Sequence, residues 1–145
     1  VDDKAYANEC YDLVRKLKLD NLIFTGRVDI KEYLKRMDFM ILTSISEGQP
    51  LSVLEAMAAG KACVTTDVGC CRELLEGRED DNLGPAGYCV PPTDLSGLAD
   101  AMLRMASVEE ERLVMGKTAK KRAGLYYQYD QMIDQYRQMY KEYVK

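Results

Sequence analysis

Four short apolar runs constrain the fold of this chain most. Each run is followed by a turn and then by a helical pattern. The runs lie at 21–26, 38–43, 62–65 and 87–90. Uninterrupted apolar runs of this kind are typical of strands that are covered on both faces of a sheet. Strands that alternate with helices predict parallel pairing with right-handed crossovers. We therefore predict an α/β fold, with a Rossmann-like parallel sheet and flanking helices.

Helical patterns occupy the segments between and after these runs. The spacing of apolar residues predicts helices at 3–19, 29–37, 51–59, 71–75, 95–105, 108–122 and 130–144. Pro50 and Gly60 bracket the third of these, as expected for the two ends of a helix. Ser107 with Glu110 matches a capping box at the start of the sixth, and Gly124 is predicted to separate the last two.

The charge balance and the lack of histidine exclude several classes of function. The 145 residues have the length of one domain, with 20 Lys and Arg against 24 Asp and Glu. This acidic balance argues against nucleic acid as a ligand, because a phosphate-tracking surface needs a basic excess. We interpret the basic run 117–122 as a solvated helix end and the acidic segment 77–85 as an exposed loop. Without histidine, Ser-His-Asp and Cys-His nucleophiles and His-ligated zinc are excluded.

The cysteines indicate a reducing compartment. Their number is odd and no Cys-x-x-Cys spacing occurs, which favours free thiols in a cytosolic protein over disulfides or zinc. They are Cys10, Cys63, Cys70, Cys71 and Cys89. Cys70 precedes a predicted helix, where it is either a reactive thiol or, as we favour, a small residue in a tight turn. No apolar run is long enough to span a membrane.

A predicted anion-binding helix end flanked by two carboxylates follows the second apolar run. Glu47 and Gly48 lie in the loop after the strand, and the helix that begins near Pro50 directs its free N–H groups to the same space. Glu55 lies about one turn inside that helix. Because carboxylates repel phosphate, they should accept hydrogen bonds from hydroxyls on either side of it, a layout that a sugar–phosphate–ribose ligand has. Alternatively, both glutamates are surface carboxylates that only stabilise the helix N-terminus.

Glu47 and Glu55 also match the Glu-x7-Glu signature of the retaining glycosyltransferases of family 4, or group 1. The stretch LTSISEGQPLSVLEAMAAGKACVTTDVGCCREL, together with NLIFTGRVDI and GPAGYCVPP, resembles that family, most of all its exopolysaccharide branch with the pellicle polysaccharide (PelF-type) enzymes. The resemblance implies a GT-B enzyme with two Rossmann-like domains. Residues 1–145 would be part of its C-terminal, nucleotide-sugar-binding domain, truncated at the N-terminal side. The helix within 125–145 would pack toward the absent N-terminal domain.

The resemblance assigns roles to residues of this chain. Glu47 would contact hydroxyls of the donor sugar as the catalytic residue, and Glu55 the ribose hydroxyls. The amides from Gly48 to Ser52 would face the sugar and diphosphate, and 26–28 would lie near the base. The predicted donor-binding residues are Gly26, Arg27, Val28, Ser46, Glu47, Gly48, Gln49, Pro50, Leu51, Ser52 and Glu55. No metal and no cofactor is expected, and the acidic run 79–81 is not a metal motif. Two upstream strands that carry Gly-Arg and Lys in the family are not in this chain.

The resulting hypothesis is the donor-binding part of a retaining hexosyltransferase that uses a UDP-sugar in polysaccharide or glycoconjugate synthesis. The acceptor, a glycan or lipid-linked sugar, would bind the absent domain, so this part alone would be inactive. We expect the enzyme in the cytoplasm or at the inner membrane face. The alternatives are a non-catalytic nucleotide-binding or regulatory module and a structural interaction module. A stripe formed by Tyr129, Ile133, Tyr136, Tyr140 and Tyr143, or an open sheet edge, would allow self-association.

Overall fold

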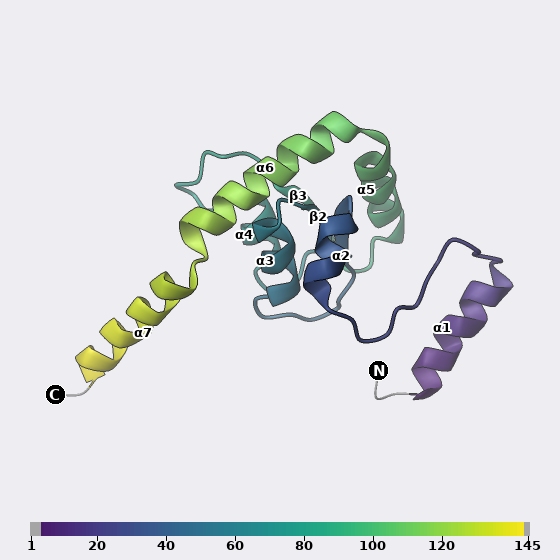
Figure 1. Ribbon diagram of the computed structural model, residues 1–145, viewed down its shortest axis with the longest axis horizontal. Coiled ribbons are helices and arrows are strands. Elements are labelled where there is room, and N and C mark those ends of the chain that lie inside the picture. Colours follow the sequence, from purple (N-terminus) through teal and green to yellow (C-terminus); the bar gives the residue numbers. More distant parts are fainter. Residues whose placement is uncertain (1–3, 144–145) are drawn as a thin grey trace.

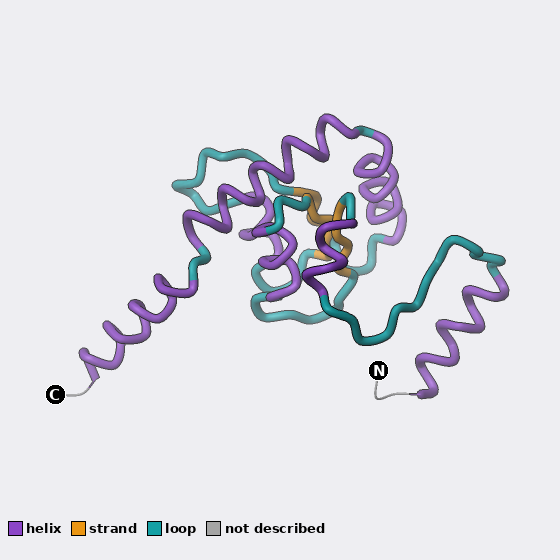
Figure 2. The backbone as a smooth tube through the Cα atoms, viewed as in Figure 1, coloured by secondary structure: helices purple, strands orange, loops and turns teal. Residues whose placement is uncertain are grey.

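A three-stranded parallel sheet with the strand order β1-β2-β3 lies at the centre of the molecule (Figures 1 and 2). The computed structural model describes residues 4–143. Its elements in chain order are α1 (Lys4–Lys16), α2 (Ile30–Arg36), β1 (Phe39–Leu42), α3 (Leu51–Ala58), β2 (Ala62–Thr66), α4 (Cys71–Glu76), β3 (Gly87–Val90), α5 (Leu95–Ser107), α6 (Glu109–Tyr126) and α7 (Tyr129–Tyr143). The predicted parallel α/β fold is confirmed.

The central strand β2 is the most buried element, with all five of its residues buried. Phe39 of β1 pairs with Ala62, and Cys63 pairs with Gly87 of β3. Successive side chains of β2 point to opposite faces of the sheet, so each face has its own core. Cys63 packs into one apolar cluster, while Val64, the next residue, packs into the other.

Helices cover both faces of the sheet. The first cluster brings α3 and α4 onto the Cys63 face, with Val53, Met57, Leu74 and Leu75 fully buried. The second places Ala101 and Met105 of α5 against Ala62 and Val64. Helix α6 contributes to both clusters and so closes the edge between the layers. This arrangement leaves the carboxyl ends of the strands free to form a site.

Helix α6 approaches the turn after α3 closely because residue 116 of α6 is glycine. Gly60 ends α3 with φ of +76°, as the sequence predicts for a helix terminus. A Cβ atom on Gly116 of α6 would overlap the Gly60 carbonyl oxygen. Glycine at 116 therefore fixes how tightly α6 packs on the domain.

The prediction of a strand at 21–26 is wrong. This segment is an exposed extended loop, and none of the described strands lies beside it. Its backbone N–H and C=O groups therefore face water instead of pairing with a neighbouring strand. Its Phe24 ring packs edge-on against Tyr11 of α1, with ring centroids 4.6 Å apart. Helix α1 and this loop lie to one side of the sheet in Figure 1. An apolar run becomes a strand only where a neighbouring strand is present.

Two predicted helix boundaries are also wrong. Helix α5 continues to Ser107, whose hydroxyl donates to the Leu103 carbonyl oxygen at 2.7 Å instead of capping α6. Helix α6 continues through Gly124 to Tyr126. Because α6 is held by buried residues just before that position, packing outweighs the modest cost of glycine in a helix. The basic run 117–122 is consequently in the middle of α6 and not at its end, with Ala119 and Arg122 buried.

The acidic segment 77–85 is not wholly exposed, contrary to the sequence-based prediction. The Asp81 carboxylate is completely buried and pairs with the buried Arg122 guanidinium, with 2.5 Å between Oδ2 and Nε. The other guanidinium N–H groups donate to the carbonyl oxygens of Leu74, Leu75 and Gly84. A buried charge requires such partners. Arg122 thereby fastens the connection between α4 and β3 onto α6.

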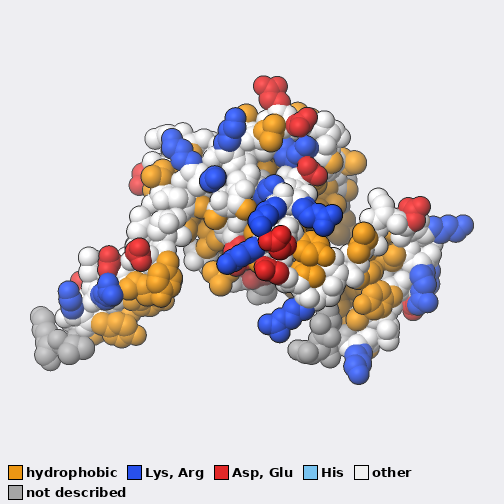
Figure 3. All heavy atoms as spheres, in the orientation of Figure 1, with side chains coloured by type: hydrophobic (Ala, Val, Ile, Leu, Met, Phe, Trp, Pro, Cys, Tyr) orange, Lys and Arg blue, Asp and Glu red, His pale blue; other side chains and the backbone are white. Residues whose placement is uncertain are grey.

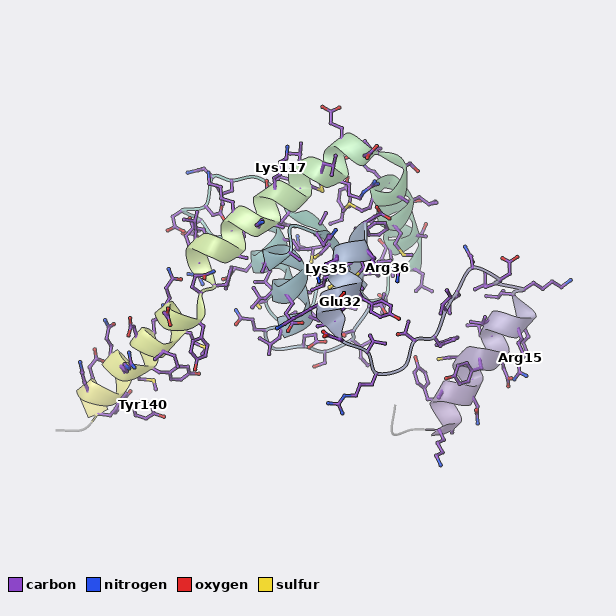
Figure 4. All side chains as sticks on the ribbon, in the orientation of Figure 1. Arg15, Glu32, Lys35, Arg36, Lys117 and Tyr140 are labelled. Atoms are coloured by element: carbon purple, nitrogen blue, oxygen red, sulfur yellow. The ribbon has the colours of Figure 1, made fainter. Side chains whose placement is uncertain are left out.

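Helix α7 extends away from the sheet, and along its described length it has no buried residue. The tyrosines of the predicted stripe are exposed, from 52% at Tyr136 to 82% at Tyr143. Figure 3 shows hydrophobic side chains gathered along one side of α7, and Figure 4 shows Tyr140 near its end. Packing of this helix toward another domain stays a prediction. Within residues 4–143, no helix combines the length and apolar character needed to cross a bilayer.

Candidate functional site

Two loops at the carboxyl end of the sheet are joined directly by hydrogen bonds. Strands β1 and β2 are neighbours, so the loops that follow them, 43–50 and 67–70, lie side by side. The Thr66 hydroxyl donates to the Ser44 carbonyl oxygen at 2.5 Å. The Cys70 amide donates to the Gly48 carbonyl oxygen at 3.0 Å. In open parallel sheets this edge is the usual place for a ligand.

Gly69 allows this close approach of the two loops. Its φ of +55° lies in the left-handed region that favours glycine. A Cβ atom at this position would overlap the carbonyl oxygens of Glu47 and Gly48. Gly69 is not among the predicted site residues. A glycine in the loop between a predicted strand and a predicted helix could have indicated it.

The carboxylate of Glu47 is fixed by its own loop. Its side chain is half-buried, and Oε1 accepts a 2.7 Å hydrogen bond from the Ser44 hydroxyl. The second oxygen, Oε2, has no hydrogen bond to any residue from 4 to 143. Ser44 is a positioning residue that sequence reasoning missed, although a serine three residues before a glutamate in a polar loop was a signal. The arrangement leaves an oriented acceptor for a ligand hydroxyl.

The N-terminus of α3, which begins four residues after Glu47, supplies free backbone donors. Pro50 is the buried N-cap and has no side-chain capping bond. Its carbonyl oxygen accepts from the amides of Val53 and Leu54, at 3.1 and 3.3 Å. Within the described chain, the N–H groups of Leu51 and Ser52 have no acceptor. These two donors and the helix dipole together favour an anionic group at this point.

Glu55 is one turn further along α3, and its side chain is exposed. Together with Gln49 and Leu51 it lines an open hollow of about 700 Å³ between α3 and α7. The predicted residues from Ser46 to Ser52 thus lie on one loop and helix end, with Glu55 at the border of the hollow. This is the layout that the sequence predicts, and the roles of these residues stay predictions.

Gly26, Arg27 and Val28 are not joined to this loop by any hydrogen bond among the described residues. A Cβ atom on Gly26 would meet no atom within 4 Å, and Arg27 has neither a hydrogen bond nor an ion pair within residues 4–143. All three residues are exposed, in the loop between α1 and α2. Their predicted position near a base stays a prediction.

The charged side chains in and just after the neighbouring loop, 67–70, form ion pairs with one another. Arg72 pairs with Asp67 and with Glu76, each at 2.6 Å. The hydrogen bond from Arg72 lowers the pKa of Asp67 below its ordinary value. Among the described residues, no group of three or more His, Cys, Asp or Glu side chains could hold a metal ion.

The thiols near the site are partly buried at Cys70 and fully buried at Cys63 and Cys71. Burial raises the pKa of Cys70 above its ordinary value, and also that of Cys71, while Cys63 rises to about 12. All five cysteines, which lie within residues 4–143, are free. The interpretation of Cys70 as a small residue in a tight turn therefore fits better than that of a reactive thiol, which would need a lowered pKa.

Comparison with known proteins decides the family. The profile of the family described as "Glycosyl transferases group 1" matches residues 3–107, well over half of the chain. The chain belongs to the group 1 glycosyltransferases. N-acetyl-alpha-D-glucosaminyl L-malate synthase of Bacillus anthracis is 32% identical over 130 residues, which are 88% of this chain and 32% of that enzyme.

Two other proteins are similar to this glycosyltransferase domain, one in sequence and one in structure. N,N'-diacetylbacillosaminyl-diphospho-undecaprenol alpha-1,3-N-acetylgalactosaminyltransferase of Campylobacter jejuni is 33% identical over 122 residues, covering 83% of this chain and 30% of that enzyme. The structure of Anabaena HepE in complex with UDP-glucose superposes with a TM-score of 0.79 at 18% identity, over 97% of this chain and 38% of HepE. That likeness shows a shared fold, the C-terminal domain of GT-B proteins. The chain spans about a third of the length of the curated relatives it matches.

Proposed function

We propose that this glycosyltransferase domain binds the nucleotide-sugar donor of a retaining sugar transfer, and that the donor is a UDP-sugar. One observation carries the proposal: in a group 1 glycosyltransferase, the oriented Glu47 carboxylate belongs to the loop that leads into α3, whose first two N–H groups are free, with Glu55 one turn inside that helix. HepE, which shares the fold, was crystallised with UDP-glucose, and this supports the choice of base.

The geometry divides the donor into three parts. Hydroxyls of the donor sugar would donate to Glu47, the diphosphate would accept from the Leu51 and Ser52 amides, and the ribose hydroxyls would donate to Glu55. When the bond from the sugar to the diphosphate breaks, negative charge grows on the departing phosphate. The helix N-terminus stabilises that charge without any reorganisation, which is how a fixed dipole lowers a barrier.

The reacting sugar carbon develops positive charge as the diphosphate departs. A carboxylate held beside the sugar stabilises this charge, and Ser44 keeps Glu47 from turning away. We propose that Glu47 is catalytic in this sense, with departure of the diphosphate and entry of the acceptor on the same face. No protein nucleophile and no metal is then required, because backbone amides take the role of a cation.

For the whole protein we propose a transferase of polysaccharide or glycoconjugate synthesis, of the PelF-type branch. Its acceptor would be a glycan or a lipid-linked sugar, and residues beyond this chain would be needed for turnover. The greater length of the relatives supports this, as does the lipid diphosphate in the name of the Campylobacter enzyme. The free cysteines support a cytoplasmic location. A position at the inner membrane face is part of the same proposal.

A thermal-shift panel tests the donor proposal. The melting temperature of the protein is measured with UDP-, GDP-, ADP- and CDP-sugars, because a ligand that binds only the folded state raises it. We expect the UDP-sugars to raise the melting temperature most and the rise to vanish in Glu55→Ala. Equal or absent shifts for all four nucleotide classes would overturn the choice of donor.

A further inference from the structure

We propose that Thr66, the last residue of β2, is a positioning residue for Glu47 and acts through Ser44. This inference rests on the proposed function, since it concerns the carboxylate to which the donor sugar is assigned. Thr66 is only 3% exposed, and its hydroxyl donates to the Ser44 carbonyl oxygen at 2.5 Å. Neither the sequence prediction nor the comparisons assign a role to it.

Thr66 lies at the point where β1 and β2 separate. The register of these two strands ends with Leu42 beside Thr65, while Thr66 still pairs with Val90 of β3 on its other side. The ladder between β1 and β2 therefore stops just before Thr66. The Thr66 hydroxyl takes the place of the ladder there, because it holds the chain two residues beyond the end of β1.

The hydroxyl of Thr66 is not required by the packing of the strand. Side chains two and four residues earlier point to the same face of the sheet, and these are the apolar Val64 and Ala62. A valine at position 66 would have nearly the same shape and an equal preference for a strand. A buried hydroxyl costs free energy unless it has a partner, and its described partner is the Ser44 carbonyl oxygen. The bond to the loop therefore accounts for a threonine at this position.

The loop that carries Glu47 is attached to the end of β2 and the loop after it at two points. The Thr66 hydroxyl holds the Ser44 carbonyl oxygen before Glu47. The Cys70 amide holds the Gly48 carbonyl oxygen after it, at 3.0 Å. Between these attachments, Oε1 of Glu47 accepts from the Ser44 hydroxyl at 2.7 Å. Because Ser44 is held by Thr66 through its backbone and holds Glu47 through its side chain, loss of the first bond should displace the second.

The strand offers a matched set of variants. Thr66→Val keeps the shape of the side chain and removes the hydroxyl, whereas Thr66→Ser keeps the hydroxyl and removes a methyl group. The control is Thr65→Val, because Thr65 is also buried and its hydroxyl donates to Sγ of Cys89 at 3.6 Å, with no described hydrogen bond to the loop 43–50. A positioning role is lost in Thr66→Val alone, whereas a role in core packing is disturbed in Thr66→Ser as well.

Calorimetric titrations of UDP-glucose into these variants, into Ser44→Ala and into the double variant Ser44→Ala/Thr66→Val test the inference. We expect Thr66→Val to weaken binding about three- to tenfold, the effect of one lost hydrogen bond, and Thr66→Ser and Thr65→Val to stay within about twofold of wild type. In the Ser44→Ala background, Thr66→Val should weaken binding by less than about a further twofold, because the bond through which it acts is already absent. Wild-type affinity in Thr66→Val, an equal loss in Thr66→Ser or Thr65→Val, or independent losses in the double variant would overturn the inference.

A readout without ligand separates this inference from the donor proposal. The carboxyl carbon resonance of Glu47 in NMR spectra, assigned with Glu47→Gln, reports on the hydrogen bond of the carboxylate. We expect this resonance to shift in Ser44→Ala and Thr66→Val and to stay in place in Thr66→Ser and Thr65→Val. If it does so while UDP-glucose does not bind the wild type, the donor proposal fails and the positioning of Glu47 by Thr66 stands. If the resonance does not move in Thr66→Val, the inference is overturned whatever UDP-glucose does. Urea unfolding verifies that each variant is folded.

Discussion

The Ser44 hydroxyl donates a 2.7 Å hydrogen bond to Oε1 of Glu47, three residues further along the same loop. The bond holds the carboxylate half-buried at the carboxyl end of β1, next to the N-terminus of α3. Because the Ser44 carbonyl oxygen also accepts from Thr66, the orientation of Glu47 depends on contacts with the neighbouring strand. The acceptor for a ligand hydroxyl is thus set before any ligand arrives.

Replacing Ser44 by alanine should release the Glu47 carboxylate. We expect the affinity for UDP-glucose to fall about three- to tenfold, since a net hydrogen bond contributes about 0.5–1.5 kcal/mol. Calorimetric titration measures the loss. Ser96→Ala, at an exposed position of α5, is the control and should bind as wild type. Wild-type affinity in Ser44→Ala would show that the bond does not position Glu47.

Replacing Gly69 by alanine should push the two site loops apart. A Cβ atom there overlaps the carbonyl oxygens of Glu47 and Gly48, whereas one on Gly84, with φ of +88°, meets nothing within 4 Å. Gly84→Ala therefore costs only the backbone strain, about 1–2 kcal/mol. We expect Gly69→Ala to lower the free energy of unfolding by more than Gly84→Ala does, and to be the one of the two that weakens UDP-glucose binding. Chemical denaturation and titration of both variants decide this.

Breaking the buried ion pair should destabilise the fold strongly. Arg122→Met leaves the Asp81 carboxylate buried without its partner, for which we expect a loss of about 3–5 kcal/mol in urea unfolding. The control is Arg137→Met, because the pair of Arg137 with Asp134 on α7 is exposed and contributes about 0–1 kcal/mol. Similar losses in the two variants would contradict the structural role given to Arg122.

The same pair predicts how stability depends on pH. The hydrogen bond from Arg122 holds the pKa of Asp81 below its ordinary value of 3.8. A carboxyl group with a lowered folded-state pKa stabilises fully above that ordinary value, and its contribution is lost as the pH falls through the folded-state pKa. We expect the urea midpoint of wild type to fall more steeply below about pH 4 than that of Asp81→Asn/Arg122→Met. Parallel pH curves would contradict the prediction.

The local pattern was sufficient to predict the elements that the site depends on. The apolar run of β1, the polar loop and the Pro50–Gly60 bracket of α3 are signals that lie within a few residues of one another, and the structure confirms these elements. The Glu-x7-Glu spacing likewise predicted that Glu47 lies in the loop before α3 and Glu55 about one turn inside this helix. Short-range chemistry decides such features, so one sequence is enough to find them.

The features that sequence reasoning missed depend on partners far along the chain. Asp81 is buried only because Arg122 arrives from 41 residues away, and an acidic turn gives no sign of this. The run at 21–26 has the composition of a strand, but its pairing depends on another strand. Glycine is needed at position 69 because the loop that carries Glu47 passes too close for a Cβ atom. Pairing and close approach between distant segments are set by tertiary packing, which a local pattern does not specify.

The most direct test of the donor proposal is a calorimetric titration of UDP-glucose into wild type, Glu55→Ala and the control Glu79→Ala, an exposed glutamate outside the site. The proposal predicts binding by wild type and Glu79→Ala. It predicts a loss of at least about tenfold in Glu55→Ala, because a hydrogen bond to a charged group contributes about 1.5–3 kcal/mol. Absence of binding by wild type, or equal affinity in Glu55→Ala, would contradict it and would leave Glu55 as a surface carboxylate of α3.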